Sequence, residues 1–293
     1  MVARCSVSES LLAGLCDDAA VFPPGNMPLD QAVPVHLQHR QGPHAGLVGP
    51  LVIAAKDLPA LAEVAADVPE GMLDVTVTVT VTVTVPLSAV SDAVADARAI
   101  PAVRLVGLEI ALPDETPVEE VVPALDDALA DNTTLMVFME VPRDGRREPL
   151  LAALAGSPYL GKFRTGGVRA DLYPDEGELA AAVLAAVRAG VPFKATAGLH
   201  HALRNTDPAT GFEQHGFLNL LVATGAALEG ADHAELVALL GERDGSRVAE
   251  RARSLAPTVR ETFRSFGTCS IAEPVEELAG LGLLPAHSSK GLL

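Results

Sequence analysis

The chain contains no tryptophan, and aromatic residues make up only 3% of its 293 residues. Almost half of the residues are nevertheless apolar, so we expect a large core built on alanine, valine and leucine. The three cysteines stand at unrelated spacings and form no CxxC pair, which argues against a disulfide framework and against a structural zinc site. We therefore expect a reducing, cytoplasmic location.

Positive charge is also scarce, with 21 Lys and Arg against 38 Asp and Glu and a net charge of −17. Such a charge argues against nucleic acid or an anionic membrane as a partner. The N-terminus lacks the apolar core of a signal peptide. The sequence also contains no long apolar run that is free of charge and proline, so we expect no membrane span. These features leave open whether the chain forms a homo-oligomer.

Short apolar runs alternate with helical patterns along the whole chain. The expected strands are at 19–23, 47–55, 75–85, 103–112, 134–141, 160–166, 191–198 and 266–271. The expected helices are at 28–40, 57–68, 88–100, 116–131, 147–155, 175–189 and 272–284. The run VTVTVTVTVTV at 75–85 is the clearest strand, because its β-branched residues alternate with period two.

Eight strands alternating with helices predict an α/β fold with a parallel sheet. At this length we expect one (β/α)8 TIM barrel domain over residues 1–293, with a helical insertion at 201–264 between strands seven and eight. No GxGxxG follows the first strand, so we expect no dinucleotide, and no other cofactor is expected.

Only four of the 21 basic residues are lysines, and two of these four lie at equivalent points of successive predicted strands. Lys162 in YLGKFRTGG and Lys194 in PFKATAGLH each end a short apolar run, 32 residues apart, which is about one βα unit. In a barrel they would lie on adjacent strands near the C-terminal face, where active sites of this fold lie. A neutral amine attacks a carbonyl, and a second cation nearby favours that neutral form. The pair therefore predicts imine (Schiff-base) catalysis.

Three short strings in order resemble the deoxyribose-phosphate aldolase family of class I aldolases. They are KFRTG at 162–166 for strand six, KATAG at 194–198 for strand seven and GTCS at 267–270 for strand eight. The strand LMVFMEV, which ends near a glutamate, is similar to strand five of that family. The strand ending VTVTVP and the turn CDDAAVFPPGNMP are weaker similarities.

The resemblance implies a metal-free aldolase or lyase acting on a small carbonyl compound, in which Lys162 forms the imine and Lys194 supports it electrostatically. The strand-four aspartate of the family, which helps move protons, has no counterpart, and Glu109 is the only acid on that strand. The paired glycines that follow the strand-seven lysine in the family, and help bind phosphate, are here Ala197 and Gly198.

Other candidate residues surround the lysines. We expect Glu140 or His200 to transfer protons. Arg164 either grips an acidic group of the substrate or forms an internal salt bridge to Glu140. Asp17 lies beside an acidic neighbour near the first strand, where the two either orient a lysine or the substrate or lie solvated in a turn. The remaining predicted substrate-binding residues are Thr165, Gly166, Gly167, Thr196, His201, His215, Asn219, Gly267, Thr268, Ser270 and Asp18.

A metal-dependent hydrolase or lyase is the first alternative. His200, His201 and His215 cluster in the sequence after strand seven, and with Glu140 or Asp18 they would form a set that binds zinc or iron. No HxH or HExxH motif accompanies them.

A non-catalytic barrel that binds a small metabolite is the second alternative. It predicts ligand binding without turnover, and an ion pair between Lys162 and Glu140 in place of a free amine.

Overall fold

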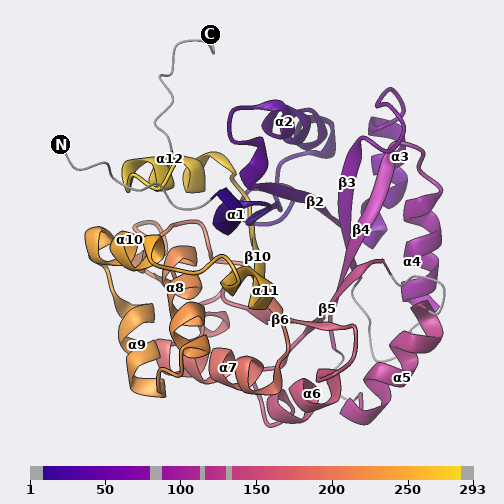
Figure 1. Ribbon diagram of the computed structural model, residues 1–293. Coiled ribbons are helices and arrows are strands. Elements are labelled where there is room, and N and C mark those ends of the chain that lie inside the picture. The colour runs from indigo at the N-terminus through magenta and orange to yellow at the C-terminus, as the bar shows by residue number, and fades with distance from the viewer. Residues whose placement is uncertain (1–8, 80–87, 113–115, 130–133, 285–293) are drawn as a thin grey trace.

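The computed structural model describes residues 9–79, 88–112, 116–129 and 134–284. Eight parallel strands close into a barrel in the order β1–β10–β7–β6–β5–β4–β3–β2, which confirms the predicted (β/α)8 fold (Figure 1). These strands are β1 (Cys16–Asp18), β2 (Val48–Ala54), β3 (Leu73–Val79), β4 (Val103–Ile110), β5 (Met136–Glu140), β6 (Leu160–Arg164), β7 (Phe193–Thr196) and β10 (Phe263–Thr268). Residues 80–85 of the long Val-Thr run lie outside the described residues.

Helices follow most strands and lie on the outside of the barrel (Figure 1). They are α2 (Leu29–Gln41), α3 (Leu58–Val64), α4 (Ser88–Arg98), α5 (Val118–Leu129), α6 (Arg147–Leu154), α7 (Glu176–Ala189) and α12 (Ala272–Gly280). Shorter helical elements are α1 (Glu9–Leu12), η1 (Ala45–Leu47), η2 (Ala55–Asp57) and η3 (Ala170–Leu172). The ends of α7 follow capping rules, since Asp175 accepts from the Glu178 amide and Gly190 adopts a φ of 66°.

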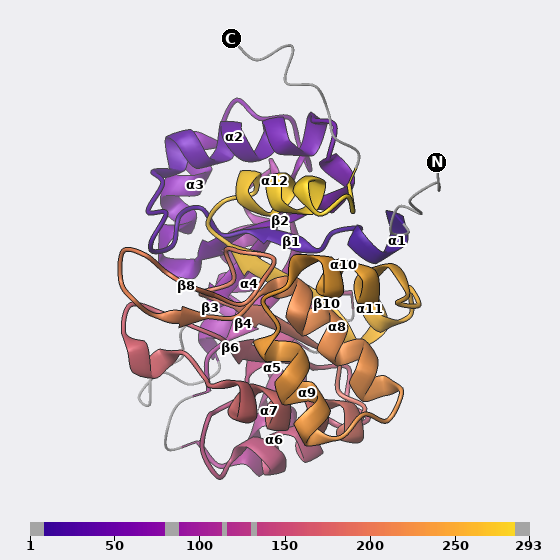
Figure 2. The same ribbon diagram turned by 90° about the vertical axis from the view of Figure 1, so that its left-hand side faces the viewer.

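The connection between β7 and β10 is the longest in the described chain. It begins with a small antiparallel hairpin of β8 (Asn205–Thr206) and β9 (Glu213–Gln214). Four helices follow and gather on one side of the barrel, α8 (Phe217–Leu228), α9 (His233–Gly241), α10 (Gly245–Arg253) and α11 (Val259–Thr262) (Figure 2). The region predicted as helical therefore also contains a β-hairpin, and β10 begins at Phe263, inside the predicted range 201–264.

The first strand lies earlier than predicted. β1 covers Cys16–Asp18 rather than 19–23, and both of its aspartates are buried. The following residues form a turn, in which the Phe22 amide donates to the Ala19 carbonyl at 2.9 Å. Acidic residues seldom occupy buried strands unless they have partners. Asp17 finds its partners far away in the sequence, at Lys194 and Ser265, whereas Asp18 pairs with His36.

Side-chain alternation divides each strand between the lumen and the helical layer. On β10, Phe266 faces outward and stacks on Phe217 of α8, with ring centroids 4.4 Å apart. On β7, Phe193 packs on Phe163 at 4.9 Å and on Phe263 at 5.5 Å. Lys162 precedes Phe163 on β6 and Lys194 follows Phe193 on β7, so both lysines point to the opposite side, into the lumen.

Candidate active site

Lys162 and Lys194 are direct neighbours across the β6–β7 pairing, and Glu140 on β5 is the register partner of Lys162. All three lie on the lumen side of their strands near the C-terminal ends. The lysines are 4% and 1% exposed. Buried ammonium groups need hydrogen-bonded counter-charges, so the acids around them decide what this pair can do.

The ammonium of Lys194 is held between two carboxylates. It donates to Asp17 Oδ2 on β1 and, at 2.6 Å, to Glu109 Oε1 on β4. Ser265 Oγ donates to the same Asp17 oxygen at 2.6 Å, and the ring centroid of Phe138 lies 5.3 Å from Nζ. Burial opposes the charge on Lys194, but Asp17 and Glu109 outweigh it and raise the pKa of this ammonium above its ordinary value. Lys194 is therefore a permanent cation at neutral pH.

Lys162 shares one of these carboxylates. Its Nζ lies 2.9 Å from Glu140 Oε2 and 3.4 Å from Glu109 Oε2, so the Glu109 carboxylate lies between the two lysines. Burial alone would raise the pKa of Glu109, but Lys194 and Lys162 outweigh it and hold the pKa of this carboxyl below its ordinary value. Glu109 is thus an ionised acid on β4 that links the two lysines.

Glu140 is ionised for a similar reason. Burial opposes its charge, but Lys162 and Arg164 outweigh it and lower the pKa of the carboxyl. Arg164 Nε lies 3.4 Å from Glu140 Oε1, so the predicted internal salt bridge exists. The Arg164 side chain is still 42% exposed, which leaves its guanidinium accessible to a ligand as well.

A cavity of about 600 Å³ opens above this network. Lys162, Glu109 and Arg164 line it, together with Thr196 and Gly267 at the ends of their strands. Lys194 is not part of the cavity wall. Of the two lysines, Lys162 is the one that a ligand in the cavity can reach.

The turn after β6 needs its glycines because two backbone segments meet there. A Cβ at Gly166 would lie 2.9 Å from the Gly198 Cα and 2.7 Å from the Tyr173 ring, and a Cβ at Gly167 would overlap Leu172. Gly167 lines the cavity. The Thr165 hydroxyl donates to the Ala197 carbonyl at 2.7 Å, so Thr165 is buried and joins the two turns.

His200 is the histidine that lines the cavity. Its Nδ1 lies 3.2 Å from the Cys269 Sγ and 3.9 Å from a Glu273 carboxylate oxygen. Burial lowers the pKa of His200, and burial together with Glu273 raises the pKa of the Cys269 thiol to about 11. The two side chains are therefore a neutral imidazole and a neutral thiol at pH 7.

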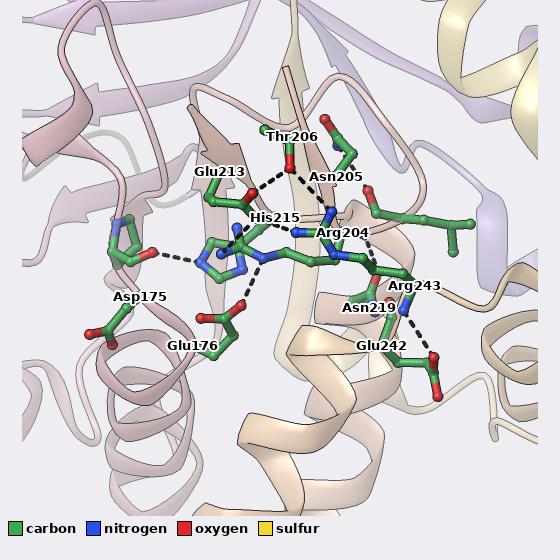
Figure 3. Close-up of polar contacts among 12 residues, drawn as sticks. Asp175, Glu176, Arg204, Asn205, Thr206, Glu213, His215, Asn219, Glu242 and Arg243 are labelled. Carbon is green, nitrogen blue, oxygen red and sulfur yellow. Dashed lines mark hydrogen bonds and ion pairs between the residues drawn. The ribbon is translucent and has the colours of Figure 1, made fainter. Parts of the chain in front are cut away.

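The other two histidines point elsewhere. His201 Nδ1 lies 2.6 Å from Glu277 on α12. His215 is buried beside Arg204 and donates from Nε2 to the Pro174 carbonyl at 2.8 Å (Figure 3). Burial and the Arg204 cation lower the pKa of His215 to about 4.

The histidine metal alternative gains no support from this geometry, because His200, His201 and His215 do not converge. Across the described ranges, no group of three or more His, Cys, Asp or Glu side chains is arranged to hold a metal ion.

Four more predicted site residues have structural contacts instead. Asp18 faces α2, where its Oδ2 lies 3.0 Å from His36 Nδ1. Asn219 accepts from the Arg204 amide at 2.9 Å and donates to two carbonyls at the end of α9. Thr268 and Ser270 bond to one another in the turn after β10, where Thr268 Oγ1 donates to the Ser270 carbonyl at 3.0 Å. None of these four is part of the cavity wall.

The sequence left two roles open for Asp17, and the buried contact with Lys194 corresponds to the first of them, a residue that orients a lysine. Glu109 and Ser265 were not among the predicted site residues. Glu109 carried a usable signal, because an acid inside the apolar run VRLVGLEIAL must be paired if that run is a buried strand. Ser265 gave no comparable signal, since its partner Asp17 lies on another strand.

No protein-family model matches the chain, and no curated protein matches it significantly. The similarity to the aldolase family therefore rests on the short strings and on their placement. In the described part of the chain, no helix is long and apolar enough to cross a bilayer.

Proposed function

We propose that this barrel is a Schiff-base lyase of the aldolase type that acts on a carbonyl compound bearing an acidic group. The observation that carries the proposal is the lysine pair in register on β6 and β7, which shares the Glu109 carboxylate. Only Lys162 of this pair reaches the cavity, and the Arg164 guanidinium lies two residues further along the same strand face.

The reaction begins with a proton transfer. The Lys162 ammonium gives a proton to Glu140 or Glu109, which are ionised and within 3.4 Å. The neutral amine then adds to the substrate carbonyl carbon, and the carbonyl oxygen takes up protons and leaves as water. The product of this step is an iminium ion on Lys162.

The bond breaks because the positively charged iminium nitrogen accepts its electron pair. Electrons from the neighbouring carbon–carbon or carbon–hydrogen bond move toward nitrogen and form an enamine, while the released group or proton departs. His200 is neutral and lines the cavity, so it can accept the proton of the β-hydroxyl, whose carbon then departs as a carbonyl compound when the carbon–carbon bond breaks. Reprotonation of the enamine and addition of water release the product and restore the amine.

A barrel that binds an acidic metabolite without turnover is the second candidate. The observation in its favour is the ion pair between Lys162 and Glu140, in which Nζ and Oε2 are 2.9 Å apart. In this case the amine keeps its proton, and Arg164 and Lys162 simply neutralise the ligand.

Deuterium exchange separates the two candidates. Pyruvate is incubated with the protein in D2O, and its methyl protons are followed by NMR. An enamine intermediate exchanges these protons, so we expect exchange with the wild type and background exchange with Lys162→Met, whose folding is checked by circular dichroism. Pyruvate binding by calorimetry without exchange would favour the binding protein.

A further inference from the structure

The chain has only ten aromatic residues, eight Phe and two Tyr. Seven of them are buried, each at most 6% exposed. The remaining three, Phe22, Tyr173 and Phe212, are only partly buried, and all three line the cavity above Lys162. We propose that the substrate carries a planar, apolar tail that packs on these three rings.

The grouping of these three rings around one cavity is not what scattered surface aromatic residues would show. A core this poor in aromatic residues gains most from burying each ring, because aromatic side chains bury a large apolar area. Partly buried rings gathered around one concavity are typical of a ligand site rather than of scattered surface residues. Val168, which is 74% exposed, adds a further apolar side chain to the same cavity wall.

Two of the three rings already pack on each other and form a preorganised apolar surface. Tyr173 and Phe212 have ring centroids 5.6 Å apart and are tilted by 58°. Tyr173 follows η3 after β6, whereas Phe212 comes from the loop between β8 and β9, so the pair joins two loops. Phe22, in the turn after β1, contributes the third ring.

The loop that carries Phe212 is held in place by its own hydrogen bonds. Asp207 Oδ1 accepts from the Ala209 and Thr210 amides at 2.7 and 3.0 Å, and the Asp207 amide donates to the Phe212 carbonyl at 2.9 Å. Binding to a ring held in this way loses little conformational entropy.

The hairpin beneath this loop is fastened to α7 by a buried polar network. Arg204 Nε donates to Glu176 Oε1 at 2.8 Å, beside the ring of His215 (Figure 3). Arg243 and Arg204 also meet Glu213 from two sides, and so connect the hairpin to the end of α9. Phe212 is therefore part of a fixed wall.

The polarity of the cavity changes with depth. Lys162 and Glu109 are at most 4% exposed and lie at its closed end, whereas the rings are only partly buried. A volume of about 600 Å³ is in the range that holds drug-sized ligands, far more than a three-carbon carbonyl compound fills. The inferred substrate is therefore an acidic carbonyl compound with an aryl or similar planar tail, an identity that rests on the proposed function.

Two matched pairs of probes test the tail. Pyruvate and phenylpyruvate are compared as carbonyl probes by borohydride trapping on the full chain, and propanoate and hydrocinnamate as probes without the reacting carbonyl by calorimetry. We expect the phenyl member of each pair to bind at least about tenfold more tightly. Phe212→Ala should reduce this preference to below about threefold, because it removes one of the rings on which the phenyl group packs. Leu228→Ala, at an exposed apolar residue on α8 away from the cavity, is the control and should keep the full preference.

Borohydride trapping and calorimetry distinguish failure of the inferred planar tail from failure of the proposed imine mechanism. Trapping of pyruvate without a phenyl preference would overturn the tail and leave the lyase proposal standing. A calorimetric preference for hydrocinnamate without any trapping would support the tail and count against imine chemistry. No binding of hydrocinnamate, or an unchanged preference in both Phe212→Ala and Tyr173→Leu, would overturn the inference.

Discussion

Lys162 and Lys194 face one another across the β6–β7 pairing, and the Glu109 carboxylate touches both ammonium groups, at 3.4 Å and 2.6 Å. The two lysines differ in their surroundings. Lys194 is enclosed by two acids below the cavity, whereas Lys162 lines the cavity and pairs with Glu140, which is not part of the cavity wall. The difference assigns a fixed positive charge to one lysine and leaves the other available for chemistry.

The Lys194 network predicts a large loss of stability when one of its acids is removed. In Asp17→Asn the Lys194 ammonium keeps a single carboxylate, so unfolding free energy should fall by about 3 kcal/mol. Urea unfolding measures this change. Asp74→Asn is the control, because Asp74 pairs with the exposed Arg104 and its loss should cost less than about 1 kcal/mol. Equal losses in the two variants would show that the buried network is not tightly coupled.

Proton transfer from Lys162 predicts a kinetic role for Glu140. Glu140→Gln keeps the shape of the side chain and removes the proton acceptor, so the rate of imine formation should fall about a hundredfold. The rate of borohydride-trapped adduct formation measures this effect. Glu178→Gln, which alters a carboxylate paired with Arg143 away from the cavity, should trap at the wild-type rate. An unchanged rate in Glu140→Gln would transfer this role to Glu109.

Ala197 predicts a stabilising substitution. It has a φ of 67°, a left-handed conformation that disfavours any side chain. Ala197→Gly should therefore raise unfolding free energy by about 1 kcal/mol, even though glycine gains entropy in the unfolded chain. Ala195→Gly on the same segment is the opposite control, because Ala195 is buried in β7, where glycine destabilises. Destabilisation by Ala197→Gly would mean that its methyl group makes a contact that outweighs the strain.

His215 predicts a pH dependence of stability. Its pKa falls from an ordinary 6.5 to about 4 in the folded chain, so the unfolded state binds more protons between these values. Unfolding free energy should therefore decrease as the pH falls from 6.5 to about 4, by up to about 3 kcal/mol. His215→Gln should flatten this part of a urea-midpoint profile. A profile that His215→Gln leaves unchanged would contradict the placement of this side chain.

The sequence predicted the barrel and the adjacency of Lys162 and Lys194, because strand periodicity and a one-unit spacing are local patterns. The sequence offered Glu140 as a partner of Lys162 and Asp17 as a residue that could orient a lysine, each as one of several alternatives, but it did not predict that Glu109 lies between the two lysines. Asp17 and Glu109 approach Lys194 from β1 and β4 across the lumen, and only the closed barrel brings those strands together.

The histidines show the opposite case. Their spacing in the sequence indicated one cluster, but alternation and the β8–β9 hairpin direct them to three different neighbours, Cys269, Glu277 and Pro174. Asp18 points to His36 on α2 for a related reason, because a shift of one residue along a strand turns a side chain from the lumen to the helical layer. The position of β1 therefore determines that Asp17, and not Asp18, points into the lumen and contacts Lys194.

Reductive trapping tests the central claim most directly. The protein is mixed with phenylpyruvate or pyruvate, reduced with borohydride and mapped by peptide mass spectrometry. We predict a single adduct on Lys162, absent in Lys162→Met, and none on Lys194, which stays protonated and outside the cavity wall. An adduct on Lys194 would reverse the assigned roles, and the absence of an adduct on either lysine, with both probes bound at saturation, would contradict imine catalysis.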